Sequence, residues 1–174
     1  MSELGDRFET LLAAHAPLID RILSAYERRP AVRAELRQEV AVALWQAMPR
    51  FRGDSGLNTY VARIAHNVGV SHVRRDAREG PHAELDETLP SDAAAPEYET
   101  SREQQRRQLA DAIRALPLGQ KQVVVMHLED FDHAQIAATL GIGEGTVAVR
   151  LTRARQALAA MLTESRRTTT EEQA

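Results

Sequence analysis

Apolar side chains recur every three or four residues along most of this chain, and this spacing restricts its fold to helices. The repeat is clearest from Leu36 to Ala47, from Leu57 to Val68 and from Val147 to Leu158. Each stretch would place one apolar stripe on a helix. No comparable stretch alternates with a period of two, and the β-branched run Val123 to Val125 also lies within a segment of helical spacing. We therefore predict an all-α fold.

Proline and glycine mark the boundaries of the predicted helices. Breakers at Pro30 and within residues 49–56 separate three helices, and residues 80–100 separate these from four shorter ones. The predicted helices span residues 4–27, 32–48, 57–78, 101–115, 118–129, 133–140 and 144–162. The sequence thus predicts two small helical domains, residues 1–79 and 101–163, with a polar tail at residues 164–174.

Composition limits the function classes. The net charge is −3, and residues 80–100 hold six acidic residues and no Lys or Arg, so we expect a flexible acidic linker between two mildly basic domains. The chain has no cysteine, which fits a reducing compartment. Its longest uncharged apolar stretch, Val40 to Pro49, is shorter than the roughly 20 residues of a membrane span. We expect a cytoplasmic protein without membrane insertion.

The segment from Phe131 to Leu162 has the spacing of a helix-turn-helix. Ala137 is a small residue for the helix crossing, Gly141 can take a positive φ in the turn, and Val147 is an apolar anchor on the second helix. On spacing alone, an αα-hairpin with a solvated basic face remains an alternative. The residues expected to share the core with Val147 are Ile136, Leu140, Ile142 and Leu151.

Residues Asp132 to Leu158 resemble region 4 of the extracytoplasmic-function (ECF) sigma factors of bacterial RNA polymerase. The most specific part is Gly145-Thr-Val followed by Arg150-Leu-Thr-Arg-Ala-Arg155, and Leu116 to Leu128 is similar to the approach to that motif. The resemblance implies that this domain reads the upstream promoter box. Side chains on the second helix that could reach the major groove or its phosphates are Thr146, Arg150, Thr152, Arg153 and Arg155.

A second stretch, Arg50 to Asn67 with Val73-Arg-Arg75, resembles region 2 of the same family. The resemblance implies that this domain reads and opens the downstream promoter box, where a flipped base enters a pocket near the loop. Leu57, Val61, Ile64 and Val68 would form the buried stripe of the helix. The residues then expected to face DNA are Arg52, Ser55, Asn58, Arg63, His66, Asn67, Arg74 and Arg75.

The segment from Glu35 to Glu39 aligns with the family surface that docks on the clamp helices of core RNA polymerase. Acidic residues beside an apolar stripe suit a basic coiled-coil partner. Trp45 follows on the same helix and is expected in the core rather than at that surface. The resemblance also implies an anti-sigma factor as a partner. The expected polymerase contacts are Glu35, Leu36, Gln38 and Glu39.

Several positions depart from the usual family pattern. Val32 and Ala34 stand where acidic residues are common, which would weaken polymerase binding. Leu57, Tyr60 and Ala62 replace frequent aromatics, and His66 and Ser71 replace a usual Arg and Asp. On the second helix of the upstream-box domain, Ala148 and Val149 replace a usual Lys-Ser, which removes about one phosphate contact. These departures predict an exacting or poorly melting promoter preference.

Little in the sequence supports a catalytic or a metal-binding function. Gly53 to Gly56 looks like the nucleophile segment of trypsin-type proteases, but those enzymes are β-barrels. Gly141 to Gly145 has neither the preceding strand nor the lysine of a phosphate loop, and the histidines lack metal-site spacing. We expect no catalysis, no metal and no cofactor. The alternatives are a helix-turn-helix regulator that binds DNA without acting as a polymerase subunit, and a pure interaction protein.

Overall fold

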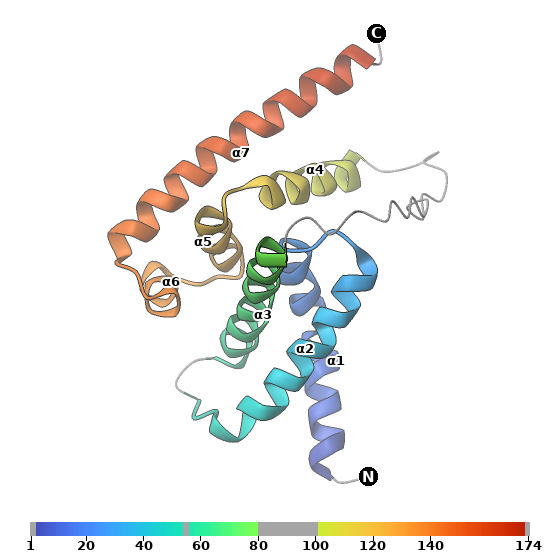
Figure 1. The fold of residues 1–174 in the computed structure, drawn as a ribbon, viewed down its shortest axis with the longest axis vertical. Coiled ribbons are helices and arrows are strands. Elements are labelled where there is room, and N and C mark those ends of the chain that lie inside the picture. Colours follow the sequence, from blue (N-terminus) through green and yellow to red (C-terminus); the bar gives the residue numbers. More distant parts are fainter. Residues whose placement is uncertain (1–2, 54–55, 80–100, 173–174) are drawn as a thin grey trace.

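The chain folds into helices throughout the part that the structure, a computed structural model, describes: residues 3–53, 56–79 and 101–172. The first group is α1 (Glu3–Ser24), α2 (Pro30–Ala47), the short 3-10 turn η1 (Met48–Arg50) and α3 (Leu57–Glu79). The second group is α4 (Ser101–Ala115), α5 (Leu118–Leu128), α6 (His133–Leu140) and α7 (Glu144–Glu172) (Figure 1). The predicted all-α fold is confirmed, whereas the predicted linker lies outside the described residues.

Three helix ends differ from the prediction by two residues or more, and one of them is the end of α1, at Ser24 instead of Glu27. Helix α7 continues to Glu172 instead of ending at Leu162, because neither glycine nor proline follows Leu162 to stop it. Helix α2 begins at Pro30 itself, since a proline in the first turn has no N–H to leave unpaired. None of the described helices combines the length and apolar character that a membrane span requires.

Helices α1, α2 and α3 pack around one another. The stripe predicted on α2 is confirmed, because Leu36, Val40 and Leu44 are at most 1% exposed. On α3, Val61 is fully buried. Leu57, Ile64 and Val68 are partly buried and pack against the same core.

Tyr26, in the turn after α1, packs directly on the backbone of α3. A Cβ atom added to Gly69 would lie only 2.4 Å from Cδ2 of Tyr26. The Tyr26 hydroxyl lies 2.8 Å from Nδ1 of His66, one turn earlier on α3. Burial raises the pKa of Tyr26 and lowers the pKa of His66 to about 4. Both side chains are therefore neutral at physiological pH, as an apolar core requires.

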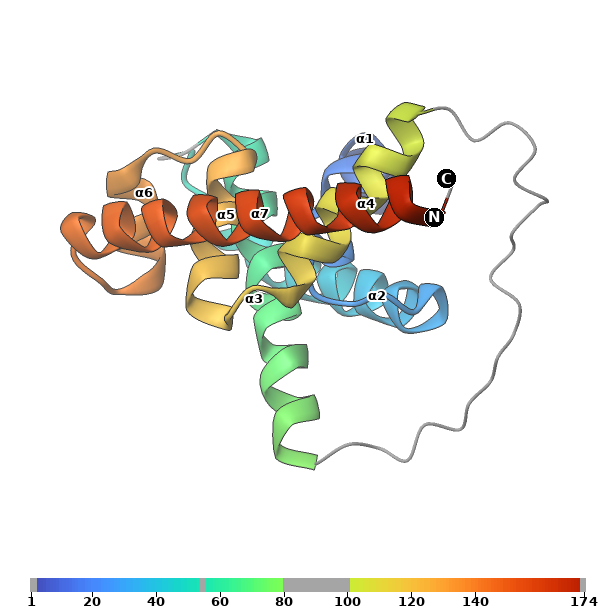
Figure 2. The same cartoon turned by 90° about the horizontal axis from the view of Figure 1, so that it is seen from above.

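Helix α7 packs on α4, α5 and α6, and Figure 2 shows it running across all three. Its core residues Val147 and Leu151 meet Val123 and Met126 of α5 and Ile136 of α6, each at most 2% exposed. The β-branched run on α5 is helical and buried, as predicted.

The two groups of helices touch where α5 packs on α3 (Figure 1). Arg21 of α1 donates two hydrogen bonds, of 3.2 and 3.0 Å, to the carboxylate of Glu129 at the end of α5. Arg114 of α4 donates to the backbone carbonyl of Ser24 at 2.9 Å. Apolar residues of both groups belong to one continuous cluster of buried residues.

The contact between Gly69 and Tyr26 predicts the effect of a single methyl group. Gly69→Ala should lower the free energy of unfolding by about 2 kcal/mol through overpacking, although alanine is the better helix former. Gly145→Ala is the matched control, because Gly145 has no atom within 4 Å of an added Cβ. Urea denaturation of both variants tests this, and equal stability of the two would contradict the close approach.

Candidate nucleic-acid interface

The helix-turn-helix consists of α6, a glycine turn and the first turns of α7. The amide of Gln135 donates to Oδ1 of Asp132 at 2.7 Å, and Oε1 of Gln135 accepts from the amide of Asp132 at 2.9 Å, so a capping box starts α6. Gly141 ends the helix with a φ of 65°, the left-handed conformation predicted for it. The amide of Ile142 donates back to the carbonyl of Ala137 at 3.1 Å.

The predicted core of this motif is confirmed. Ile136, Val147 and Leu151 are at most 2% exposed, and Leu140 and Ile142 are partly buried against them. Burial of one stripe of α7 turns its opposite face to solvent. This arrangement can present a helix to the major groove.

The residues predicted to read the upstream box lie on or beside that outer face. Thr146, Thr152, Arg153 and Arg155 are exposed, and Arg150 is half-buried. Arg150 lies over α5, where its Cζ would be 3.4 Å from a Cβ added to Gly119. Nη2 of Arg155 lies 3.2 Å from Nε2 of His127.

The residues predicted to read the downstream box divide into four sets. Ser55 lies outside the described residues. His66 is only 1% exposed, so its placement on an outer face was wrong. Arg63 is half-buried, with no hydrogen-bond partner for its Nε among the described residues. The exposed members are Arg52, Asn58, Asn67, Arg74 and Arg75.

The error at His66 has a structural cause. One buried stripe was predicted on this helix. In the structure α3 packs against three helices, α1, α2 and α5. A second buried row, including Ala62, Ala65 and Gly69, therefore runs beside the predicted one and contains His66. This second row could not be predicted without knowing that Gly69 packs closely on Tyr26.

Models of known protein families match both halves of the chain. The family model of sigma-70 region 2 matches residues 11–79, and that of sigma-70 region 4 matches residues 106–158. Together the two matches cover more than two thirds of the chain. The chain belongs to the ECF sigma factors of the sigma-70 family.

Sigma factors of this group resemble the chain over most of its length. The ECF RNA polymerase sigma factor SigM of Mycobacterium tuberculosis is 29% identical over 91% of this chain and 79% of its own. The ECF RNA polymerase sigma-E factor of Escherichia coli is 27% identical over 88% of this chain and 86% of its own. The sigma factor RpoE of Bartonella quintana, solved with the anti-sigma factor NepR, shares the fold, with a TM-score of 0.66 at 19% identity over 90% of this chain and 97% of that one.

A groove between α2 and α3 of region 2 brings the predicted polymerase and DNA residues together. It has a volume of about 770 Å³, and Glu35, Gln38, Glu39 and Asn67 line it. Nη2 of Arg75 lies 3.1 Å from Oε1 of Glu39, so an ion pair joins the two predicted surfaces.

Two predictions on α2 were wrong and one residue was missed. Leu36, expected to contact polymerase, is 1% exposed and belongs to the core. Trp45, expected in the core, is 46% exposed and packs edge-to-face with Phe8, with 4.9 Å between the ring centroids. Val42, at 56% exposed, is the missed apolar residue. Val42 lies one turn before Trp45 on the same helix, and this spacing could have indicated that both lie on one side of α2.

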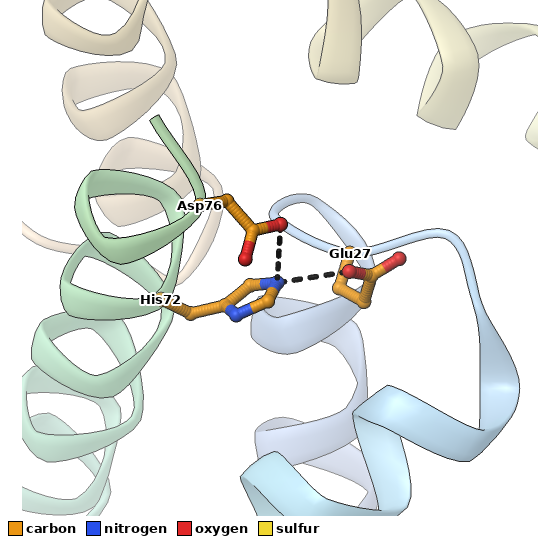
Figure 3. Close-up of side chains that lie close together, drawn as sticks. All are labelled: Glu27, His72 and Asp76. Carbon is orange, nitrogen blue, oxygen red and sulfur yellow. Dashed lines mark hydrogen bonds and ion pairs between the residues drawn. The ribbon is translucent and has the colours of Figure 1, made fainter. Parts of the chain in front are cut away.

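A polar cluster in region 2 was not predicted from the sequence. Oε2 of Glu27 lies 2.8 Å from Nε2 of His72, which lies 3.7 Å from Oδ2 of Asp76 (Figure 3). These donor types suit a divalent metal, but Nη2 of Arg29 lies 2.8 Å from Glu27 and 3.5 Å from Asp76. The guanidinium already supplies the positive charge there, so the cluster is best described as an ion-pair network joining α3 to the turn after α1.

The network controls the ionisation of Glu27. Burial alone would raise the pKa of this carboxyl group. Hydrogen bonds from the side chain and backbone of Arg29 and from His72 outweigh burial and lower the pKa to about 2. The folded chain therefore binds this proton less tightly than the unfolded chain, whose carboxyl has the ordinary pKa of 4.5. The resulting stabilisation is complete above pH 4.5 and disappears as the pH falls toward 2.

Glu27→Gln should lower the free energy of unfolding at pH 7 by about 3 kcal/mol, because it removes the buried carboxylate that accepts hydrogen bonds from buried His72 and from Arg29. The difference from the natural chain should shrink at pH 3, where part of the native contribution is already lost. Asp20→Asn is the control, since its ion pair with Arg37 is exposed on both sides and contributes less than about 1 kcal/mol. Urea titrations at both pH values test this, and a pH-independent difference would contradict it.

Proposed function

We propose that this chain binds core RNA polymerase, directs it to a promoter and takes part in opening the DNA. The observation that carries this proposal is the presence, in family order, of region 2 and region 4 on one chain. The exposed outer face of α7 supports the DNA-binding part. A regulator that only binds DNA would need region 4 alone.

Region 4 is proposed to read the upstream box. Arg153 is exposed and can hold a phosphate, while Arg150 and Arg155 can do so from positions set by contacts with α5. The contact residues proposed for this box are Thr146, Arg150, Thr152, Arg153 and Arg155.

Region 2 is proposed to read the downstream box with a smaller set than the sequence predicted. Without His66, cations near the ends of α3 and amides along it remain to meet phosphates and the edges of unstacked bases. Ser55 stays a prediction for the pocket that receives a flipped base. The other proposed contacts are Arg52, Asn58, Arg63, Asn67, Arg74 and Arg75.

The proposed polymerase surface is the exposed side of α2. Glu35, Gln38 and Glu39 supply an acidic and polar edge, and Val42 and Trp45 supply apolar area beside it. A basic coiled coil presents complementary charge to the first and apolar side chains to the second. Exposed tryptophans are frequent centres of binding energy in such interfaces.

We further propose regulation and location by analogy with the family. RpoE of Bartonella quintana was solved with the anti-sigma factor NepR, and a partner of this kind could cover the same DNA and polymerase surfaces here. The chain would act in the cytoplasm, by binding rather than by catalysis, and without a cofactor. Residues 1–79 and 101–163 are the proposed domains, joined through residues 80–100.

Transcription with purified core RNA polymerase tests the function. The natural chain should co-elute with the core enzyme and produce run-off transcripts from the DNA upstream of its own gene. Stable DNA binding without any association with polymerase would instead support the regulator. Promoter-independent binding to another protein alone would support a pure interaction protein.

Variants on α2 test the polymerase surface. Glu35→Lys should weaken core binding about fivefold through lost charge complementarity, and Trp45→Ala about tenfold or more through lost apolar contact. Asp111→Lys is the control, because it changes the net charge equally at an exposed carboxylate of α4. Equal binding by all variants would exclude this side of α2 as the polymerase surface.

A further inference from the structure

Val149 stands out on the face of α7 that the proposed function assigns to DNA. Half of its side chain is exposed, at 50%, whereas the neighbouring apolar residues Val147 and Leu151 are at most 2% exposed. Val149 is therefore not needed to hold α7 in the core of region 4. Its exposure makes it available to a ligand of that face.

The position of Val149 on the helix is central. Thr146, Val149 and Arg153 follow one another at intervals of three and four residues, which puts them on one stripe of α7. All three are exposed. Val149 also lies within the first two turns of α7, which begins at Glu144. The N-terminal turns of a recognition helix are those that meet base edges.

On the side of Val149 that faces away from Thr146 and Arg153, the neighbouring side chains that the structure describes offer no free hydrogen-bond donor. The hydroxyl of Thr152, three residues on, donates to the backbone carbonyl of Ala148 at 3.0 Å. That donor is therefore already used within the helix. Ala148 itself offers only a methyl group. Val149 and Ala148 therefore form a small apolar patch beside the polar side chains of Thr146 and Arg153.

The flanking arginines are held by the fold. Arg150 lies over Gly119, and Nη2 of Arg155 lies 3.2 Å from His127. From these positions they can contact phosphates, which orients the helix without reading sequence. Apolar contact with a base then falls to Val149, which lies between these arginines around the helix.

We propose that Val149 reads the C5-methyl group of a thymine in the upstream box. This inference rests on the proposed function of region 4. The thymine methyl is the apolar group that base pairs present in the major groove, where the other edges are donors and acceptors. A valine opposite guanine or cytosine would remove water from those polar groups and return no hydrogen bond, which costs affinity. Val149 therefore favours thymine and disfavours G·C pairs.

The test deletes the methyl group from the DNA. The upstream box is first defined by selecting from a randomised duplex library with the full chain bound to core RNA polymerase. Each thymine of the selected box is then replaced in turn by deoxyuridine, which lacks only that methyl. One replacement should weaken binding about fourfold, the factor expected for one buried methyl group.

Two variants locate the effect. Val149→Ala should bind the thymine and deoxyuridine duplexes nearly equally. Arg153→Ala should weaken binding to both duplexes alike and reduce the salt dependence by about one phosphate contact, so the fourfold ratio should persist. Circular dichroism of both variants checks that these exposed substitutions leave the helices intact.

The possible results distinguish a failure of the inference about Val149 from a failure of the proposed function on which it rests. If the polymerase complex selects no DNA sequence, the proposed function fails. If it selects a box in which no deoxyuridine replacement matters, or if Val149→Ala keeps the ratio, the reading of thymine by Val149 is overturned. A ratio that disappears in Val149→Ala and persists in Arg153→Ala supports it.

Discussion

The packing of α3 against three neighbours organises the rest of this structure. Tyr26 lies so close to Gly69 that no side chain fits between them, which sets the distance between α1 and α3. On another face α3 meets α2, and on a third it meets α5. The same helix therefore stabilises region 2, forms one wall of the groove with α2, and contacts the helices of region 4. Only the remaining strip of α3 is exposed.

Helix α7 divides its residues between core and surface differently from α3. Its buried residues, such as Val147, Leu151 and Ala154, form one narrow stripe, because its neighbours α4, α5 and α6 cover it from one side. A broad outer face remains free along the first turns. The capping box of α6 and the left-handed Gly141 fix the angle at which that face emerges. Region 4 thus exposes a surface, whereas region 2 exposes the margins of a buried helix.

This difference explains which residues could be predicted from the sequence. Periodicity and helix breakers together located the seven described α-helices, and spacing located the helix-turn-helix core, since these depend on local sequence. Periodicity misplaced His66, because a period shows one buried face and does not count the helices that pack on the others. On α2 periodicity placed Leu36 correctly in the buried stripe, whereas the family resemblance had placed it at the polymerase surface, and Trp45, expected in the core, is exposed. The cluster of Glu27, Arg29 and His72 joins residues distant in the chain, so no local pattern indicated it.

Charge is the poorest guide to the DNA-binding surfaces. The chain has a formal net charge of −3, and several of its basic groups are already paired with carboxylates, such as Arg29 with Glu27 and Arg37 with Asp20. Cations that remain available, such as Arg153, attract any duplex equally, because phosphates carry no sequence information. Uncharged side chains at fixed positions among those cations can add selectivity through contacts with base edges. On α7 the helix geometry puts Val149 at such a position, so a substitution that lowers overall affinity for DNA need not reduce its specificity.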